Sequence, residues 1–330
     1  MARGKPTISR EAAFLLATLP FPRKTCICDV GANPVNVPPY AGLLSAGGCR
    51  VTGFEPNPVA FGQLMETKGA DETYHNVAVG DGSELDLHLY DFATMTSIFP
   101  PHEAGYRAIG AERWGKVNAV EKMKTVAIDA LDGLEPFDCL KIDIQGGEQL
   151  VFRNARRMLA EAVCVIVEAR YMQLYENEPM IGGVDEELRA QGFMLHKFMF
   201  NKSRPMPNSQ MRRLKRKLVL DQLVDGDAVY LRHPGRIGDW TEAQLCHGAL
   251  LGAAVFSSHS FVLYCLDELV RRGAVNARTP ARYVDALPSA LREGGDAPRV
   301  PDRVLRRRKA RAERAANADG NPEAPDQAAE

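Results

Sequence analysis

The sequence of 330 residues lacks the features of a membrane-spanning, secreted or zinc-binding protein. No run of about 18 apolar residues occurs, so no transmembrane helix is expected. The stretch after Met1 has no apolar core of the kind found in a signal peptide. Seven cysteines are scattered along the chain, and the pair Cys26 and Cys28 is not followed by a second pair at zinc-ligand spacing. We therefore expect a cytoplasmic protein with reduced cysteines and no metal site.

The sequence also lacks an excess of charge. Its formal net charge is −1, which does not decide for or against a nucleic-acid partner, so any charge-driven binding must come from local patches. In the basic segment 200–226, Met211, Leu214 and Leu218 recur at helical spacing among Arg and Lys. This segment is either a solvated helix face or a lid that attracts an anionic substrate. The basic stretch from Arg303 to Arg314 has no aromatic residue to stack on bases, so no nucleic acid is expected there.

Continuous apolar segments alternate with amphipathic ones, a pattern that predicts a parallel sheet covered by helices on both faces. Such strands are expected at 25–30, 50–54, 139–143 and 162–168. A further strand is expected near 73–79, and 85–90 alternates with period two, as in a half-exposed antiparallel strand. The segment 228–231 would return antiparallel to 193–199. The predicted fold is α/β, with a doubly wound, mostly parallel sheet whose last strand is antiparallel.

The pattern divides the chain into four parts: a helical lead-in over 1–24, the α/β domain over 25–233, a helical pair over 234–284, and a tail over 285–330. The two helices are expected near 240–251 and 261–272. This small C-terminal extension could offer a protein contact through 240–273. The tail is basic at first and then of low complexity, which predicts disorder.

Two acidic residues follow strands that the pattern places side by side. Asp29 precedes Gly31 at the end of the first strand, and Glu55 closes the second. In a doubly wound sheet, ligands bind beyond the carboxyl ends of the strands. A pyrophosphate would want backbone N–H groups there, whereas S-adenosylmethionine carries an ammonium and a sulfonium that an acid favours. The dinucleotide motif Gly-x-Gly-x-x-Gly is absent, because Asn33, Pro34 and Asn36 stand in its place.

Five motifs in order resemble the FkbM family of methyltransferases. They are Asp29 to Asn33, Phe54 to Asn57, Asn76 to Asp81, Leu140 to Glu148, and Val167 to Arg170 with Leu174 to Glu176. The resemblance covers about 25–200. It implies a class I methyltransferase (Rossmann-like) fold and methyl transfer from S-adenosylmethionine, usually to a hydroxyl oxygen.

The resemblance also implies which residues bind the cofactor. Those implied to surround the methionine part are Asp29, Gly31, Ala32 and Asn33. Glu55 would hold the ribose with Asn57 beside it, and Asn76, Val77 and Ala78 would lie against the adenine. Asp143 and Gln145 would face the transferable methyl group. One departure is Val35, where family members commonly carry a glycine.

Asp143 is the first candidate for a catalytic base, because it follows an apolar strand that ends in the expected cleft. It could equally position cofactor or substrate by hydrogen bonding. Lys141 would oppose a rise in the pKa of Asp143, and Glu168 could orient a hydroxyl, so both are catalytic candidates. Glu148 complements a helix dipole in the simpler interpretation, and His102 is an alternative base.

Three functions remain open at this point. The first is O-methylation of a sugar, glycan or small-molecule acceptor, which would be anionic if 200–226 covers the site. The second is a nicotinamide-dependent oxidoreductase on a similar fold. The third is a catalytically silent methyltransferase fold that binds a partner protein.

Overall fold

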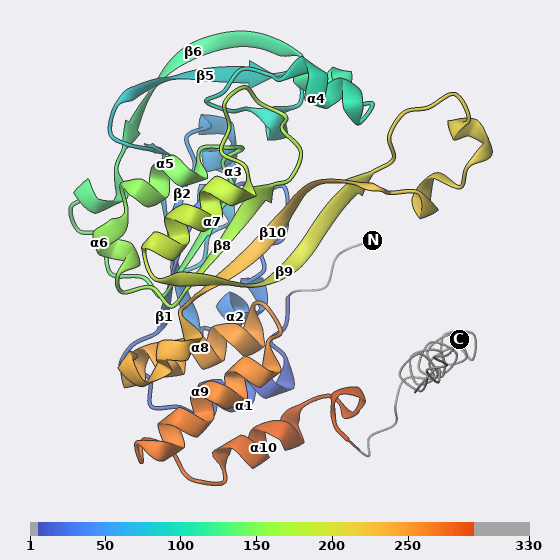
Figure 1. Ribbon diagram of the computed structural model, residues 1–330. Coiled ribbons are helices and arrows are strands. Elements are labelled where there is room, and N and C mark those ends of the chain that lie inside the picture. The colour runs from blue at the N-terminus through green and yellow to red at the C-terminus, as the bar shows by residue number, and fades with distance from the viewer. Residues whose placement is uncertain (1–5, 294–330) are drawn as a thin grey trace, which may run out of the picture. The chain divides into compact units, whose positions relative to one another are not determined.

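The computed structural model describes residues 6–293, and their central feature is a seven-stranded sheet. Its strands are β1 (Thr25–Val30), β2 (Cys49–Phe54), β3 (Glu72–His75), β7 (Cys139–Ile142), β8 (Cys164–Arg170), β9 (Phe193–Arg204) and β10 (Gln222–Arg232). They lie in the order β3-β2-β1-β7-β8-β10-β9. All neighbours are parallel except β10, which is antiparallel to both β8 and β9. The predicted doubly wound sheet with an antiparallel strand is confirmed, and its order reverses between β1 and β7 (Figure 1).

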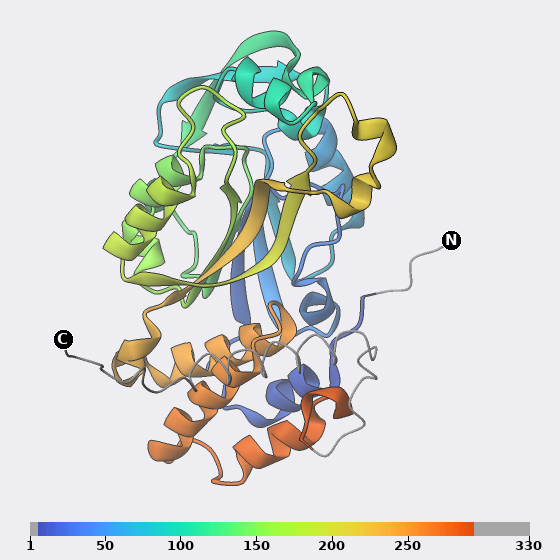
Figure 2. The ribbon, with the colours of Figure 1, turned by 45° about the vertical axis from the view of Figure 1, so that its right-hand side comes forward.

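Helices cover this sheet because their apolar faces need a partner surface. The described helices are α1 (Arg10–Thr18), α2 (Ala41–Ser45), α3 (Pro58–Thr67), α4 (Glu103–Ala108), α5 (Glu148–Arg153), α6 (Arg156–Leu159), α7 (Ile181–Ala190), α8 (Glu242–Ala254), α9 (His259–Arg271) and α10 (Thr279–Ala286). Phe152 of α5 and Leu188 of α7 join Val30 and Leu140 of the strands in one buried core. Figure 2 shows α5 and α7 on one side of the sheet and α3 on the other.

A second sheet lies above the carboxyl ends of the parallel strands (Figure 1). It consists of β4 (Ala78–Val79), β6 (Val117–Val126) and β5 (Glu84–Tyr90), with β5 antiparallel to β6. The half-exposed strand expected over 85–90 is therefore present. The prediction of a single strand near 73–79 is wrong, because this segment contains two strands. β3 ends at His75 in the main sheet, and β4 pairs with β6 in the second sheet. Asn76 and Val77 form the linker between β3 and β4.

The helical spacing of apolar residues in the basic segment between β9 and β10 suggested a helix, but the structure describes this segment without an α-helix. The segment forms two short 3₁₀ turns, Met211–Arg213 and Arg216–Leu218, within a long loop. Leu214 and Leu218 are both exposed. Without a surface to bury them, an amphipathic pattern gains nothing from helix formation, since most helical stability in proteins comes from tertiary packing.

The expected C-terminal pair of helices is present as α8 and α9, which pack on each other. Thr241 and Gln244 form a capping box at the start of α8. His247 of α8 reaches Thr25 at the amino end of β1, with Nδ1 2.9 Å from Oγ1. The pair therefore lies at the opposite end of the sheet from the carboxyl ends of the strands.

Two further expectations concern the C-terminal tail and the absence of a transmembrane helix. The basic stretch from Arg303 to Arg314 and the low-complexity tail lie outside the described residues. Within residues 6–293, no helix has the length and apolar character needed to cross a membrane.

Candidate active site

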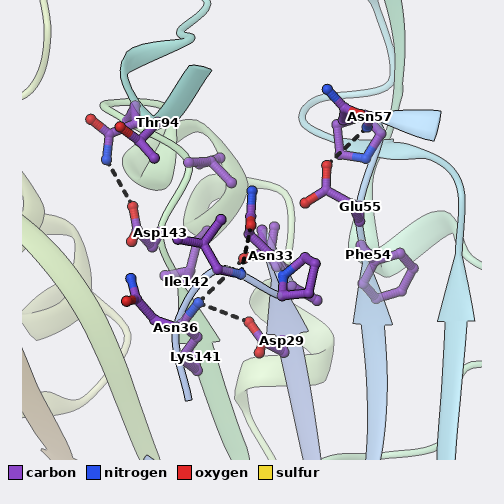
Figure 3. A pocket seen from close by; sticks show the side chains of 18 of the residues that line it. Asp29, Asn33, Asn36, Phe54, Glu55, Asn57, Thr94, Lys141, Ile142 and Asp143 are labelled. Carbon is purple, nitrogen blue, oxygen red and sulfur yellow. Dashed lines mark hydrogen bonds and ion pairs between the residues drawn. The ribbon is translucent and has the colours of Figure 1, made fainter. Parts of the chain in front are cut away.

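A large cleft opens at the carboxyl ends of β1, β2, β7 and β8, where the strand order reverses. Its volume is about 1270 Å³. Asp29 lies at the end of β1, Glu55 directly follows the neighbouring parallel strand β2, and both line this cleft (Figure 3). The expectation that the two acids meet at one end of the sheet is therefore met. This is the place where doubly wound folds bind their ligands.

Asp29 is only 2% exposed and has two polar neighbours. Tyr40 donates its hydroxyl hydrogen to Oδ2 at 2.5 Å, and Lys141 Nζ lies 3.1 Å from Oδ1. Burial lowers the pKa of Lys141, but the carboxylates of Asp29 and Asp143 outweigh this effect and raise it above its ordinary value. Lys141 is therefore charged, and it forms an ion pair with the Asp29 carboxylate.

Gly31 is needed where the loop after β1 crosses the loop after β7. Its φ is +81°, and a Cβ atom there would lie 2.2 Å from the carbonyl oxygen of Asp143. The N–H groups of Gly31 and Ala32 both donate to the carbonyl of Phe54, at 3.0 and 3.1 Å. These contacts fix the turn after β1 against the end of β2. Ala32 and Asn33 line the cleft beyond that turn.

Glu55 is buried and lines the cleft. Its Oε1 accepts from the N–H of Asn57 at 2.8 Å. Burial raises the pKa of Glu55, and the charge of Asp29 adds to that rise, while the hydrogen bond from Asn57 opposes it. The side chain of Asn57 caps α3 by accepting from Val59 and Ala60, so it is committed to the helix although the residue lines the cleft.

The residues of the segment 76–78, which was expected to lie beside the adenine, have two different roles. Val77 and Ala78 line the cleft with apolar side chains. Asn76 instead donates from Nδ2 to the carbonyls of Glu55 and Pro56, at 2.8 and 3.1 Å. Asn76 therefore holds the turn that presents Glu55.

Gln145 links the polar groups on the other side of the cleft. Its φ of +59° is unusual for a residue with a side chain. Nε2 donates to Asp143 Oδ1 at 2.9 Å and to Glu168 Oε2 at 2.7 Å. Oε1 accepts from Arg170 at 3.2 Å and from the Tyr175 hydroxyl at 2.9 Å. The amide thus fixes Asp143 and Glu168 relative to each other.

Arg170 is a buried residue that the sequence did not single out as a site residue. Its guanidinium lies within 2.9 Å of Glu168, 3.3 Å of Glu178 and 3.1 Å of Asp225. Asp225 pairs with Arg170 in the antiparallel register of β10 on β8. Glu168 and Arg170 lie two residues apart on β8, but Asp225 joins them only through the pairing of β10 with β8, which no local pattern in the sequence shows.

The carboxylates on this side differ in their surroundings. Burial, and then the charge of Asp143, raise the pKa of Glu168 well above its ordinary value, although Arg170 opposes the rise. Burial also raises the pKa of Glu148 to about 7. Glu148 accepts from the N–H groups of Ile144 and Gly146, at 2.9 and 3.2 Å, so it holds the loop that carries Gln145.

His102 does not belong to the cleft lining among the described residues. Its Nδ1 accepts from the N–H of Gly105 at 3.1 Å and caps α4. The structure therefore gives no support to His102 as an alternative base.

Comparisons with solved structures gave several distant likenesses. The methyltransferase FkbM from Methylobacillus flagellatus is 14% identical, with a TM-score of 0.35 over 63% of this chain and 43% of that one. The magnesium protoporphyrin IX methyltransferase from Synechocystis, solved with bound SAM, is 11% identical, with a TM-score of 0.34 over 67% and 76%. An O-methyltransferase from a Brevibacillus brevis multienzyme is also 11% identical, with a TM-score of 0.34 over 80% and 84%.

The chain spans 43% of the length of the Methylobacillus protein, which is less than half of it. No curated protein matches the chain. A family model does match: residues 29–195, which are more than half of the chain, match the methyltransferase FkbM domain. The matched range contains Asp29, Glu55, Asp143 and Glu168, which line the cleft. The chain belongs to the FkbM family of methyltransferases.

Proposed function

We propose that this chain binds S-adenosylmethionine in the cleft and transfers its methyl group to a hydroxyl oxygen of a sugar, glycan or small molecule. One observation carries the cofactor assignment: Asp29 at the end of β1 and Glu55 just after the adjacent parallel strand β2 line one cleft where the sheet order reverses. The residues of the cleft can be tested for their fit to this cofactor.

The methionine part fits the region around Asp29 and Gly31. Asp29 Oδ1 is buried and makes no hydrogen bond among the described residues, although Lys141 is close enough for an ion pair. A carboxylate oxygen can accept from more than one donor, so the ammonium group of the methionine part can bind Asp29 beside Lys141. Gly31 lines the cleft at that turn, where its missing side chain makes room for the carbonyl of Asp143.

The adenosyl part fits the region around Glu55. An acidic residue after the second strand of such a sheet can accept hydrogen bonds from ribose hydroxyls. The apolar side chains of Val77 and Ala78 offer a surface for the adenine ring. Asn57 and Asn76 support this arrangement indirectly, because one orders Glu55 through its N–H and the other holds the turn behind it.

Transfer to oxygen is supported by the carboxylates on the opposite side. S-adenosylmethionine supplies an electrophilic methyl group, so the protein must align the hydroxyl and accept its proton. Glu168 has a raised pKa, and Gln145 holds it beside Asp143. A rise in pKa makes a carboxylate a stronger base, which favours Glu168 as proton acceptor over Asp143, the first candidate from the sequence. Asp143 would then orient the hydroxyl.

The cleft favours a neutral acceptor over an anionic one. The loop 205–221, which carries most of the basic residues of 200–226, contributes nothing to the lining among the described residues. Lys202 does line it, but Asp225 and Asp227 line it as well. Burial, and then the charge of Asp143, raise the pKa of Asp227. An acceptor with several hydroxyl groups suits this mixture of donors and acceptors.

The proposal is tested by calorimetric titration with S-adenosylhomocysteine and with NAD, followed by a screen for methyl transfer. The screen uses S-adenosylmethionine with a labelled methyl group and a panel of glycans, sugars and phenols. We expect binding of the adenosyl ligand, no binding of NAD, and a labelled product with the stability of a methyl ether. Binding of NAD alone would indicate an oxidoreductase. Cofactor binding without transfer to any acceptor would indicate a silent fold with a binding role.

A further inference from the structure

The loop between β9 and β10, residues 205–221, is a surface that the cleft does not use. We call it the hairpin tip. Figures 1 and 2 show it at the far end of the long β9–β10 hairpin, projecting away from both sheets. Among the described residues, none of 205–221 lines the cleft. Its composition therefore calls for a separate explanation.

The hairpin tip concentrates positive charge on a chain that is nearly neutral. Its five exposed cations are Arg212, Arg213, Lys215, Arg216 and Lys217. Within residues 6–293, none of them forms an ion pair with an acidic side chain. Asp221 is the one acidic residue of the tip, whereas the whole chain has a formal net charge of −1. An exposed, unpaired cluster of this kind attracts a polyanionic surface.

The same loop exposes large aliphatic side chains between the cations. Leu218 is 77% exposed, and Met206, Leu214 and Leu220 are exposed as well. Exposing several such side chains in one projecting loop forgoes the gain of burying them, which marks an interaction site. Leu214 and Leu218 flank the continuous run of Lys215, Arg216 and Lys217. Any partner must therefore accept apolar groups and cations within the same few residues.

This combination distinguishes a lipid surface from a nucleic acid. Single-stranded nucleic acids are bound by cations together with aromatic side chains that stack on the bases, and 205–221 contains no aromatic residue. A bilayer surface with acidic lipids offers anionic headgroups above an apolar layer. Cations can contact the headgroups while neighbouring leucine side chains enter the apolar layer.

We propose that the hairpin tip docks on an anionic lipid surface, with its five cations at the headgroups and Leu214 and Leu218 in the apolar layer below. This inference does not depend on the proposed methyl transfer, because the tip and the cleft share no residue. Docking at the tip would use no residue of the cleft lining, although Lys202 and Asp225 of the same hairpin line the cleft next to it.

The test is sedimentation of the full chain with vesicles. One set contains equal parts of phosphatidylcholine and phosphatidylserine, and the other contains phosphatidylcholine alone. We expect binding to the first set only, and weaker binding as salt is raised. Each cation near such a surface contributes about fivefold to the affinity, so replacing all five by Gln should lower it by at least about a hundredfold. The variant Leu214→Ser with Leu218→Ser should bind more weakly while keeping every charge.

A matched control removes five exposed cations elsewhere: Arg10→Gln, Lys68→Gln, Lys124→Gln, Arg189→Gln and Arg236→Gln. It has the same net charge as the tip variant, and it should lose far less affinity. Thermal unfolding shows whether each variant is folded. The proposal is overturned if the wild-type chain ignores acidic vesicles, if the control loses as much affinity as the tip variant, or if the leucine variant binds like wild type. Binding of a single-stranded oligonucleotide through the same cations, without vesicle binding, would also overturn it.

Discussion

Lys141 Nζ lies 3.1 Å from Asp29 Oδ1, across the parallel strands β7 and β1 at which the sheet order reverses. Asp29 is buried, and its other oxygen accepts from Tyr40. The lining of the cleft therefore includes a buried ion pair. Lys141 of the neighbouring strand thus holds the Asp29 carboxylate in place, and its loss should lower the stability of the fold.

Replacing Lys141 by Met should destabilise the fold, because it leaves the Asp29 carboxylate buried without a cation. We expect the free energy of unfolding to fall by about 3 kcal/mol, measured by urea denaturation. The double variant Lys141→Met with Asp29→Asn should recover part of that loss. Lys24→Met is the control, because Lys24 pairs with Asp71 at 2.7 Å on the surface and should cost less than about 1 kcal/mol. Equal losses for Lys141→Met and Lys24→Met would contradict a buried pair.

Replacing Gln145 by Ala should lower turnover more than cofactor affinity. The change removes the amide that links Asp143, Glu168, Arg170 and Tyr175. We expect kcat to fall by about a hundredfold, the usual contribution of a positioned base, while the dissociation constant of S-adenosylhomocysteine changes little. Gln149→Ala is the control, because Gln149 donates to the carbonyl of Gly183 away from the cleft. An unchanged kcat in Gln145→Ala would remove this network from the mechanism.

The raised pKa of Glu168 predicts the acid side of the pH profile. A base must be ionised to accept a proton, so kcat/KM should fall as pH decreases through this raised pKa. The fall should therefore begin above the range of an exposed glutamate, about 4.3. In Glu168→Gln this limb should disappear together with most of the activity. If the limb instead survives in Glu168→Gln and disappears in Asp143→Asn, then Asp143 is the base.

His247 predicts a second pH effect, on stability. The side chain is 0% exposed, and burial lowers its pKa to about 4. The unfolded chain binds a proton below about 6.5, whereas the folded chain does so only near 4. Stability should thus be complete above about 6.5 and fall by up to about 3 kcal/mol as pH decreases to 4.

The measurement for His247 is the free energy of unfolding at several pH values. His247→Gln should flatten the slope between pH 6.5 and 4. His75→Gln, at an exposed position, is the control. A slope that is the same in wild type and His247→Gln would show that another group causes it.

The sequence was sufficient to predict the sheet and the meeting of Asp29 and Glu55. Both acids lie at the carboxyl ends of strands, Asp29 within β1 and Glu55 just after β2, and the carboxyl ends of adjacent parallel strands meet at one edge. Their surroundings could not be predicted in the same way. The contacts of Arg170 with Asp225 and of Lys141 with Asp29 depend on which strands become neighbours and in which register.

The basic loop shows a different limit of sequence patterns. Helical spacing at Met211, Leu214 and Leu218 predicted a helix face, yet the structure has two 3₁₀ turns there. A period in the sequence reports which residues could share a face. It does not report whether the fold supplies a surface for that face, and in this loop the leucines remain exposed.

The central claim is that Glu55 and Asp29 hold an adenosyl ligand, and calorimetric titration with S-adenosylhomocysteine tests it most directly. Hydrogen bonds to a charged group contribute about 1.5–3 kcal/mol each, so Glu55→Gln should weaken binding by about ten- to a hundredfold. Glu66→Gln, on the exposed side of α3, should bind like wild type. Wild-type affinity in Glu55→Gln, or no heat of binding in the unaltered chain, would contradict the account.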